Sequence, residues 1–214
     1  LTFVWKLWFL LAATAALIIA GSAFLQKEVA IILGLIFGAW KTFKPNVLVH
    51  NFTELFIYGG LAAIFVPLFN LWSVIILLIF ISAYDAYAVW KSKHMIALAK
   101  SQAKAHIFAG LMIPYKIGTG IGKAVKKPAK GMKAGKVRTA ILGGGDIGFP
   151  LIFAGVVLKE FGLWQSLIIP FGALLGLAVL LWKGDENKFY PAMPFISAGC
   201  FIALGMVWAI GLLV

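Results

Sequence analysis

Two carboxylates, Asp85 and Asp146, lie inside long apolar stretches of the 214-residue chain. Two carboxyl groups held close together in a medium of low dielectric constant cannot both ionise, so one keeps a proton while the other acts as a base. Such a pair can activate a water molecule for attack on a peptide carbonyl group, or it can line a path for protons or cations. It can also simply join two helices through a hydrogen bond. On the positions of the two residues alone, all three interpretations stay open.

The composition places these carboxylates in a membrane. Hydrophobic residues make up 63% of the chain and charged residues 12%, with a mean hydropathy of +1.01, whereas soluble domains average about 45–50% and about 25%. A soluble globular enzyme is therefore excluded. The single cysteine, Cys200, rules out a disulfide framework and a cysteine-based metal site. The three histidines show no ligand spacing, so we expect neither a metal nor an organic cofactor.

Seven apolar segments are candidates for membrane-spanning helices. A bilayer core about 30 Å thick needs roughly 20 mostly apolar residues, and the segments are apolar on all sides, which favours an all-α helical bundle over a barrel. They cover residues 3–25, 29–43, 55–69, 71–90, 140–158, 164–182 and 191–214. Seven tryptophans fall near the proposed ends, as in an interfacial aromatic belt: Trp5, Trp8, Trp40, Trp72, Trp90, Trp164 and Trp182.

The net charge of +12 comes from one segment. Residues 91–139 hold twelve of the nineteen Lys and Arg residues and none of the seven acidic ones. Because cytoplasmic loops carry the excess of basic residues, we expect this segment inside and the C-terminus outside a cell membrane. The chain then divides into residues 1–90, a basic loop 91–139 and residues 140–214. The loop is expected to attract anionic lipids and not nucleic acid. The sequence leaves open whether the protein forms a homo-oligomer.

The two carboxylates are predicted to lie at the same depth. Asp85 is five residues before Trp90, and Asp146 is six residues after Ala140. At about 1.5 Å per residue both lie about 8–9 Å below the inner membrane surface. Their helices are antiparallel and joined by the inside loop, so the two side chains can meet.

Three short motifs surround this predicted site. Tyr84-Asp85 and Gly143-Gly144-Gly145-Asp146 contain the two acids, and Pro191-Ala192-Met193-Pro194 opens the last span. Glycines allow close approach of backbone or substrate, and the prolines disfavour regular helix. Irregular backbone in lipid is tolerated only beside protein or a water-filled cavity.

In order and spacing, the three motifs resemble the YD, GxGD and PAL signatures of the presenilin and signal peptide peptidase family of intramembrane aspartyl proteases. Residues 81–100 look similar to the archaeal presenilin homologues in particular. The resemblance implies a nine-helix fold whose last four helices are the last four predicted spans, with two N-terminal helices absent from this chain. It implies catalytic roles for Asp85 and Asp146. It further implies roles in shaping the active site or binding substrate for Tyr84, Gly143, Gly144, Gly145, Pro191, Ala192 and Met193; Met193 departs from the usual Leu.

We therefore expect an aspartic endopeptidase that hydrolyses peptide bonds of single-span membrane proteins near the inner surface. The alternatives are a proton or cation channel or carrier that uses the same two acids, and a non-enzymatic scaffold. Residues 107–113 and 137–142 could form a hairpin that captures unwound substrate by strand addition. The other interpretation of these residues is a disordered loop that flanks an interfacial helix.

Overall fold

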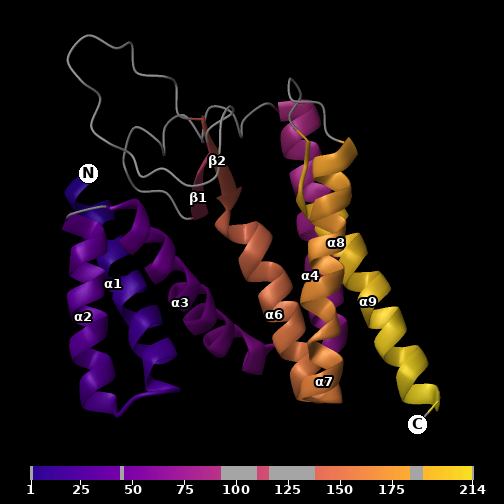
Figure 1. The fold of residues 1–214 in the computed structure, drawn as a ribbon, viewed down its shortest axis with the longest axis horizontal. Helices are drawn as coiled ribbons and strands as arrows, with labels where there is room; N and C mark the ends of the chain where they lie inside the picture. Colours follow the sequence, from indigo (N-terminus) through magenta and orange to yellow (C-terminus); the bar gives the residue numbers. More distant parts are fainter. Residues whose placement is uncertain (1, 44–45, 93–109, 116–137, 184–189, 214) are drawn as a thin grey trace.

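The computed structural model describes residues 2–43, 46–92, 110–115, 138–183 and 190–213 of the chain (Figure 1). Its α-helices are α1 (Thr2–Ser22), α2 (Lys27–Phe43), α3 (Val47–Phe65), α4 (Leu71–Tyr87), α6 (Gly144–Phe161), α7 (Leu163–Ser166), α8 (Ile168–Lys183) and α9 (Met193–Leu213). A 3-10 turn, Val66–Leu68, follows α3, and a π-helical turn, Ala88–Ser92, continues α4. Strands β1 (Gly110–Tyr115) and β2 (Arg138–Gly143) form a two-stranded antiparallel sheet.

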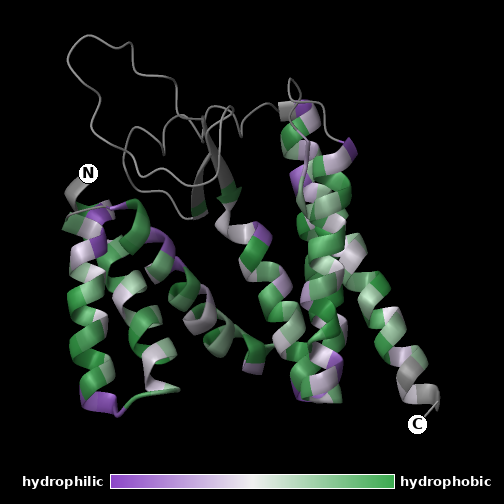
Figure 2. Ribbon diagram, in the orientation of Figure 1, coloured by the Kyte–Doolittle hydropathy of each residue, from purple (hydrophilic) through white to green (hydrophobic). Residues whose placement is uncertain are grey.

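The predicted class, a polytopic bundle of membrane helices, is confirmed. Four helical segments in the described part of the chain are long and apolar enough to cross a membrane: Val4–Ser22, Val47–Leu68, Leu71–Lys91 and Leu163–Lys183. Helices α2, α6 and α9 pack beside them. The helices are mostly hydrophobic along their length (Figure 2), and large apolar side chains are exposed on them, such as Phe80 at 71% and Trp182 at 86%. A soluble protein does not expose aromatic surface on this scale, so these side chains meet lipid.

The predicted aromatic belt agrees with the structure, because all seven tryptophans near helix ends are exposed. The two ends of the chain lie at opposite ends of the bundle, and the sheet lies at the end that holds the N-terminus (Figure 1).

The helices form two groups joined by α3. In the first group, α1, α2 and α3 pack on one another. In the second, α4, α6, α8 and α9 enclose a core that includes Leu78, Phe153 and Cys200, all fully buried. Helix α3 contacts α6, and the turn after α3 comes close because Gly155 has no side chain to collide with Val66. Helix α6 is therefore the member of the second group that contacts the first.

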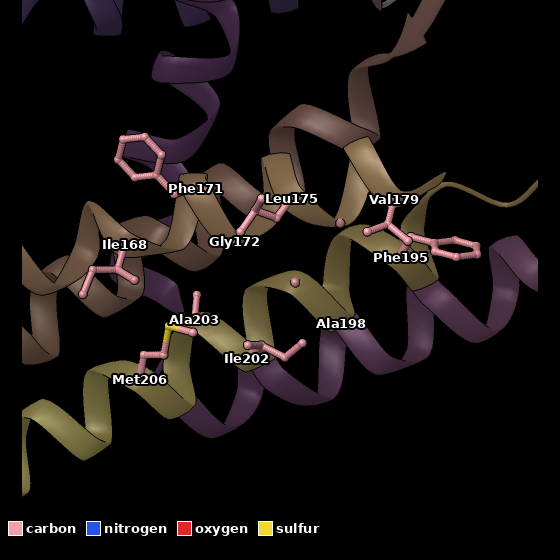
Figure 3. A pocket seen from close by; sticks show the side chains of 12 residues that line it. Ile168, Phe171, Gly172, Leu175, Val179, Phe195, Ala198, Ile202, Ala203 and Met206 are labelled. Atoms are coloured by element: carbon pink, nitrogen blue, oxygen red, sulfur yellow. The ribbon is translucent and has the colours of Figure 1, made fainter. Parts of the chain in front are cut away.

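Helices α8 and α9 approach until their backbones touch. A Cβ added at Gly172 or Gly176 of α8, or at Gly199 of α9, would overlap a backbone carbonyl of the other helix. Small residues that allow such close approach are typical of membrane helix pairs. On the outer face of this contact lies an apolar groove of about 290 Å³, which Phe171 and Ile202 help to line (Figure 3).

Two predicted helix boundaries were wrong. The third span was predicted to begin at residue 55, but α3 begins at Val47, where the Asn46 side chain accepts a hydrogen bond from the Leu48 N–H. His50, Thr53 and Glu54 lowered the hydropathy of its first two turns, but all three are buried and contact Lys41 of α2. The fifth span was predicted to begin at residue 140, but residues 138–143 form β2 and α6 begins at Gly144. Asp146 therefore lies in the first turn of its helix and not six residues into it.

The predicted pairing of residues 107–113 with 137–142 is confirmed for the described strands, with Gly110 opposite Gly143 and Tyr115 opposite Arg138. Residues 107–109 and 137 lie outside the described part. The same holds for most of the basic segment 91–139, of which only residues 91–92, 110–115 and 138–139 are described.

Candidate active site

Asp85 lies in the last turn of α4, just before the π-helical turn, and is only 7% exposed. Its carboxylate Oδ2 accepts a hydrogen bond of 3.0 Å from the backbone N–H of Met193. The N–H of Ala192 also donates to this carboxylate. A carboxylate from one helix therefore occupies the N-terminus of another, where backbone N–H groups lack partners within their own helix and the helix dipole favours negative charge.

The motif that opens α9 explains this contact. Pro191 is fully buried and precedes the helix, while Met193 is its first residue and is 4% exposed. Pro194 has no N–H, so the donors available at this helix start come from the residues just before it. The sequence predicts this motif close to the depth of the two acids, and in the structure Ala192 and Met193 contact Asp85.

Two serines reinforce the contact between α4 and α9. The Ser82 hydroxyl, one helical turn before Asp85, lies 2.8 Å from the Ser197 hydroxyl and 3.4 Å from the Met193 carbonyl oxygen. Ser197 is 2% exposed. The sequence analysis missed both serines. Ser82 is three residues from Asp85 and Ser197 is four residues from Met193, so each serine lies on the same helix face as that residue. This spacing is the sequence pattern from which the two serines could have been predicted.

Asp146 is the third residue of α6, and Gly143 is the N-cap. The Asp146 carboxylate accepts a hydrogen bond from the backbone N–H of Gly143, which is the geometry by which an acid at the third helical position satisfies the start of its own helix. A Cβ added to Gly143 would lie 3.1 Å from Asp146 Oδ2. The missing side chain at Gly143 therefore leaves room for the carboxylate.

The structure brings the two acids into one region. Helices α4 and α6 pack on each other and both contact α9, and the charge of Asp85 acts electrostatically on Asp146. Gly143, Ala192 and Met193 adjoin this pair. Tyr84, by contrast, is 66% exposed, and Gly145 is an exposed residue whose added Cβ would meet only the Phe149 ring.

Of the remaining predicted site residues, Gly144 forms the first residue of α6 and Pro191 packs at the foot of α9. Gly144 thus lies within the same helix start as Asp146. The described arrangement places two buried or half-buried carboxyl groups on neighbouring helices, each with a backbone N–H donor. Carboxyl groups placed in this way can take up and release protons.

The fold is that of an integral membrane protein. Its helices hold two carboxyl groups, which are suited to acid–base chemistry. The model of the signal-peptide peptidase and presenilin aspartyl protease family matches residues 1–212. The chain belongs to this family, and the family is one of aspartyl proteases that work within membranes. Comparisons with curated proteins and with solved structures gave no significant match. The particular likeness to archaeal homologues stays a prediction.

Proposed function

We propose that this chain is an intramembrane aspartyl endopeptidase in which Asp85 and Asp146 are the catalytic pair. The observation that carries the proposal is the joint placement of the two acids: Asp85 bonded to the N–H of Met193 and Asp146 coupled to it electrostatically from the next helix. Family membership supports the reaction class. The backbone donors orient both carboxyl groups, which reduces the motion needed to reach a reactive geometry.

In the proposed reaction the pair holds one proton between its two carboxyl groups. The ionised carboxylate takes a proton from a water molecule, whose oxygen forms a bond to the substrate carbonyl carbon. The protonated carboxyl donates its proton to the carbonyl oxygen, giving a tetrahedral diol. Collapse of the diol breaks the C–N bond: the leaving nitrogen takes the proton from one acid, while one diol hydroxyl gives its proton to the other carboxylate as the C=O bond re-forms. The pair is then singly protonated again. The pair titrates as a unit, so neither residue is assigned as the permanent base.

The substrates would be single-span membrane helices, because the site lies among lipid-facing helices. A helix hides its peptide bonds, so the substrate must unwind before hydrolysis. The two-stranded sheet offers a partner for the unwound segment: β1 packs against α3, and we propose that the other edge, that of β2, pairs with substrate. Strand β2 leads directly into α6 and Asp146, which would bring a paired segment to the acids.

We further propose that the 91–139 segment is cytoplasmic, where its basic residues attract anionic lipids. The C-terminus is then extracytoplasmic.

The direct test is reconstitution in vesicles with a single-span helical substrate. We expect the wild type to cleave it and Asp85→Asn and Asp146→Asn each to abolish cleavage, because an amide cannot exchange the proton. Glu160→Gln is the matched control, since Glu160 is an exposed acid at the far end of the same helix as Asp146, and it should keep full activity. Cleavage by either Asn variant would contradict the proposal. Proton or cation flux that depends on both acids, without proteolysis, would favour the channel or carrier.

A hydroxyl-containing analogue of the tetrahedral diol gives an independent test. Binding only to the folded protein at 100 times its Kd should stabilise the wild type by about 2.7 kcal/mol. Asp85→Asn should lose most of this stabilisation, because the diol hydroxyls are recognised through the carboxyl pair. Equal thermal protection of both proteins would place the binding site elsewhere.

A further inference from the structure

A second buried polar cluster lies between α2 and α3, away from the proposed catalytic pair. Lys41 of α2 forms an ion pair with Glu54 of α3, with Nζ and Oε1 2.6 Å apart. His50 and Thr53 of α3 complete the cluster, and all four residues are less than 9% exposed. The proposed reaction uses none of them.

The donors and acceptors of the cluster match. The Lys41 ammonium group has three N–H donors and no acceptor. It faces three acceptors: Glu54 Oε1 at 2.6 Å, Thr53 Oγ1 at 3.3 Å and His50 Nδ1 at 3.3 Å. The Thr53 hydroxyl in turn lies 2.8 Å from the Val49 carbonyl oxygen and 2.9 Å from that of His50. No buried charge within the cluster is left without its partner, which is the condition for burying it at low cost.

This arrangement decides which nitrogen of His50 carries the proton. Because Lys41 can only donate, His50 Nδ1 must accept, and the proton of the neutral ring lies on Nε2. His50 Nε2 is 2.9 Å from the backbone carbonyl oxygen of Gly110. A carbonyl oxygen can only accept, so Nε2 donates to it. The lysine therefore sets the tautomer that allows the histidine to bind the sheet.

Gly110 is the point where this bond acts on the rest of the molecule. It is the first residue of β1, it is buried, and its partner across the sheet is Gly143. Gly143 is the N-cap of α6, and its N–H donates to the Asp146 carboxylate. Gly110 and Gly143 are thus the two residues that connect the imidazole of His50 to Asp146. The bond spans 60 residues of sequence and joins the first helical group to the sheet.

The histidine contact is additional to what helix packing requires. The Lys41–Glu54 pair already connects α2 with α3, and Lys41 also lies over the Phe9 ring of α1, 5.8 Å from its centroid. The bond from His50 to Gly110 adds nothing to the contact between these helices. It fixes only the position of β1, whose register determines where Gly143 lies.

We propose that Lys41, His50 and Glu54 are positioning residues that hold the Gly110 carbonyl, and through the Gly110–Gly143 pair keep the start of α6 and Asp146 in place. The consequence for catalysis rests on the proposed function. The consequence for the sheet does not, so the two can be tested separately.

Two variants of His50 form a matched pair. In His50→Gln the side-chain amide nitrogen is as many bonds from Cα as Nε2 is, so the donor to Gly110 is kept. In His50→Asn the amide nitrogen is one bond closer to Cα and falls short. Both replacements are polar and uncharged. As a control for general loss of stability, Gly34→Ala crowds Ile18 of α1 in the same helical group without touching the cluster.

Amide hydrogen exchange of the full-length protein in lipid nanodiscs gives the readout that needs no activity. Because His50→Asn loses one hydrogen bond, we expect its amides in residues 110–115 and 138–143 to exchange roughly five- to tenfold faster than those of the wild type. His50→Gln and Gly34→Ala should exchange there like the wild type. Equal exchange in the Asn and Gln variants, or equally faster exchange in the Gly34 variant, would overturn the anchoring of the sheet.

Cleavage kinetics test the effect on Asp146. We expect His50→Asn to lower kcat by a similar factor with KM changed less than twofold, and His50→Gln to restore kcat. Faster exchange with unchanged kcat would overturn the link to Asp146. If the wild type cleaves nothing, the proposed function fails, while the exchange comparison still stands.

Imidazole nitrogen NMR of the wild type tests the tautomer without any variant. The expected spectrum shows His50 protonated at Nε2 and not at Nδ1, with its N–H protected from exchange. A ring protonated at Nδ1 would overturn the proposal even if His50→Asn failed to fold.

Discussion

Replacing Gly143 by alanine would perturb Asp146 and little else. The backbone at Gly143 has φ −62° and ψ 143°, a conformation that alanine adopts without strain. The added Cβ would lie 3.1 Å from Asp146 Oδ2, whereas ordinary contacts of this kind begin at 3.4 Å. The carboxylate must therefore move by a few tenths of an ångström.

The size of the effect follows from this displacement. A misplacement of 1 Å at a reacting group can cost about 100-fold in rate, so a shift of a few tenths should lower kcat about three- to tenfold, or about 0.7–1.4 kcal/mol in the activation free energy. The free energy of unfolding should change by less than about 0.5 kcal/mol. Alanine is a poorer N-cap than glycine, but it also lowers the entropy of the unfolded chain, and the two effects oppose each other.

The control is Gly148→Ala in the next turn of the same helix, where an added Cβ would meet nothing within 4 Å. It should stabilise α6 by about 0.5–1 kcal/mol and leave kcat unchanged. The assay compares initial rates of substrate cleavage in nanodiscs with thermal unfolding of each variant. Equal rates for the two alanine variants would refute the reasoning, as would a loss of activity in Gly143→Ala that merely follows a loss of folded protein.

Three further predictions address the packing around the site and the orientation of the chain. Ser82→Ala should destabilise the contact between α4 and α9 by about 0.6–1.7 kcal/mol and lower kcat, measured by thermal unfolding and cleavage rate; an unchanged kcat would show that this contact does not orient the site. Gly199→Ala should cost about 1–3 kcal/mol, because its Cβ would overlap a carbonyl of α8, whereas Gly205→Ala, which faces open space, should not. In intact cells a membrane-impermeant thiol reagent should label Gln26→Cys and spare Lys123→Cys; the reverse pattern would invert the proposed topology.

Much of the site could be predicted from the residues themselves. Asp85 and Asp146 stand out because an acid in an apolar segment is costly wherever the segment folds, so it indicates a partner or a cavity before any contact is known. The glycines before Asp146 and the prolines around Met193 indicate breaks in the helices, because these preferences belong to the local backbone. The sheet could be proposed for a similar reason, from two short apolar runs, one within the basic segment 91–139 and one at its end.

The parts that sequence analysis missed depend on contacts between distant residues. Hydropathy assigned the segment that contains His50 and Glu54 to a loop, because both are polar. The structure places them inside α3, where Lys41 provides the opposite charge. Ser82 likewise looks unremarkable in an apolar helix until α9 brings Ser197 within 2.8 Å.

By itself the sequence determined the class of the protein: a membrane bundle, its apolar spans and the two acids within them, since each of these reflects the free energy of transferring a local segment into lipid. Only the tertiary structure decided where α3 and α6 begin and what holds Asp85 and His50. A buried polar group is stable only when its partner is present, and that partner lies 108 residues away for Asp85 and 60 residues away for His50. Local sequence patterns do not indicate which distant residues will be partners, because these contacts form only when the chain folds.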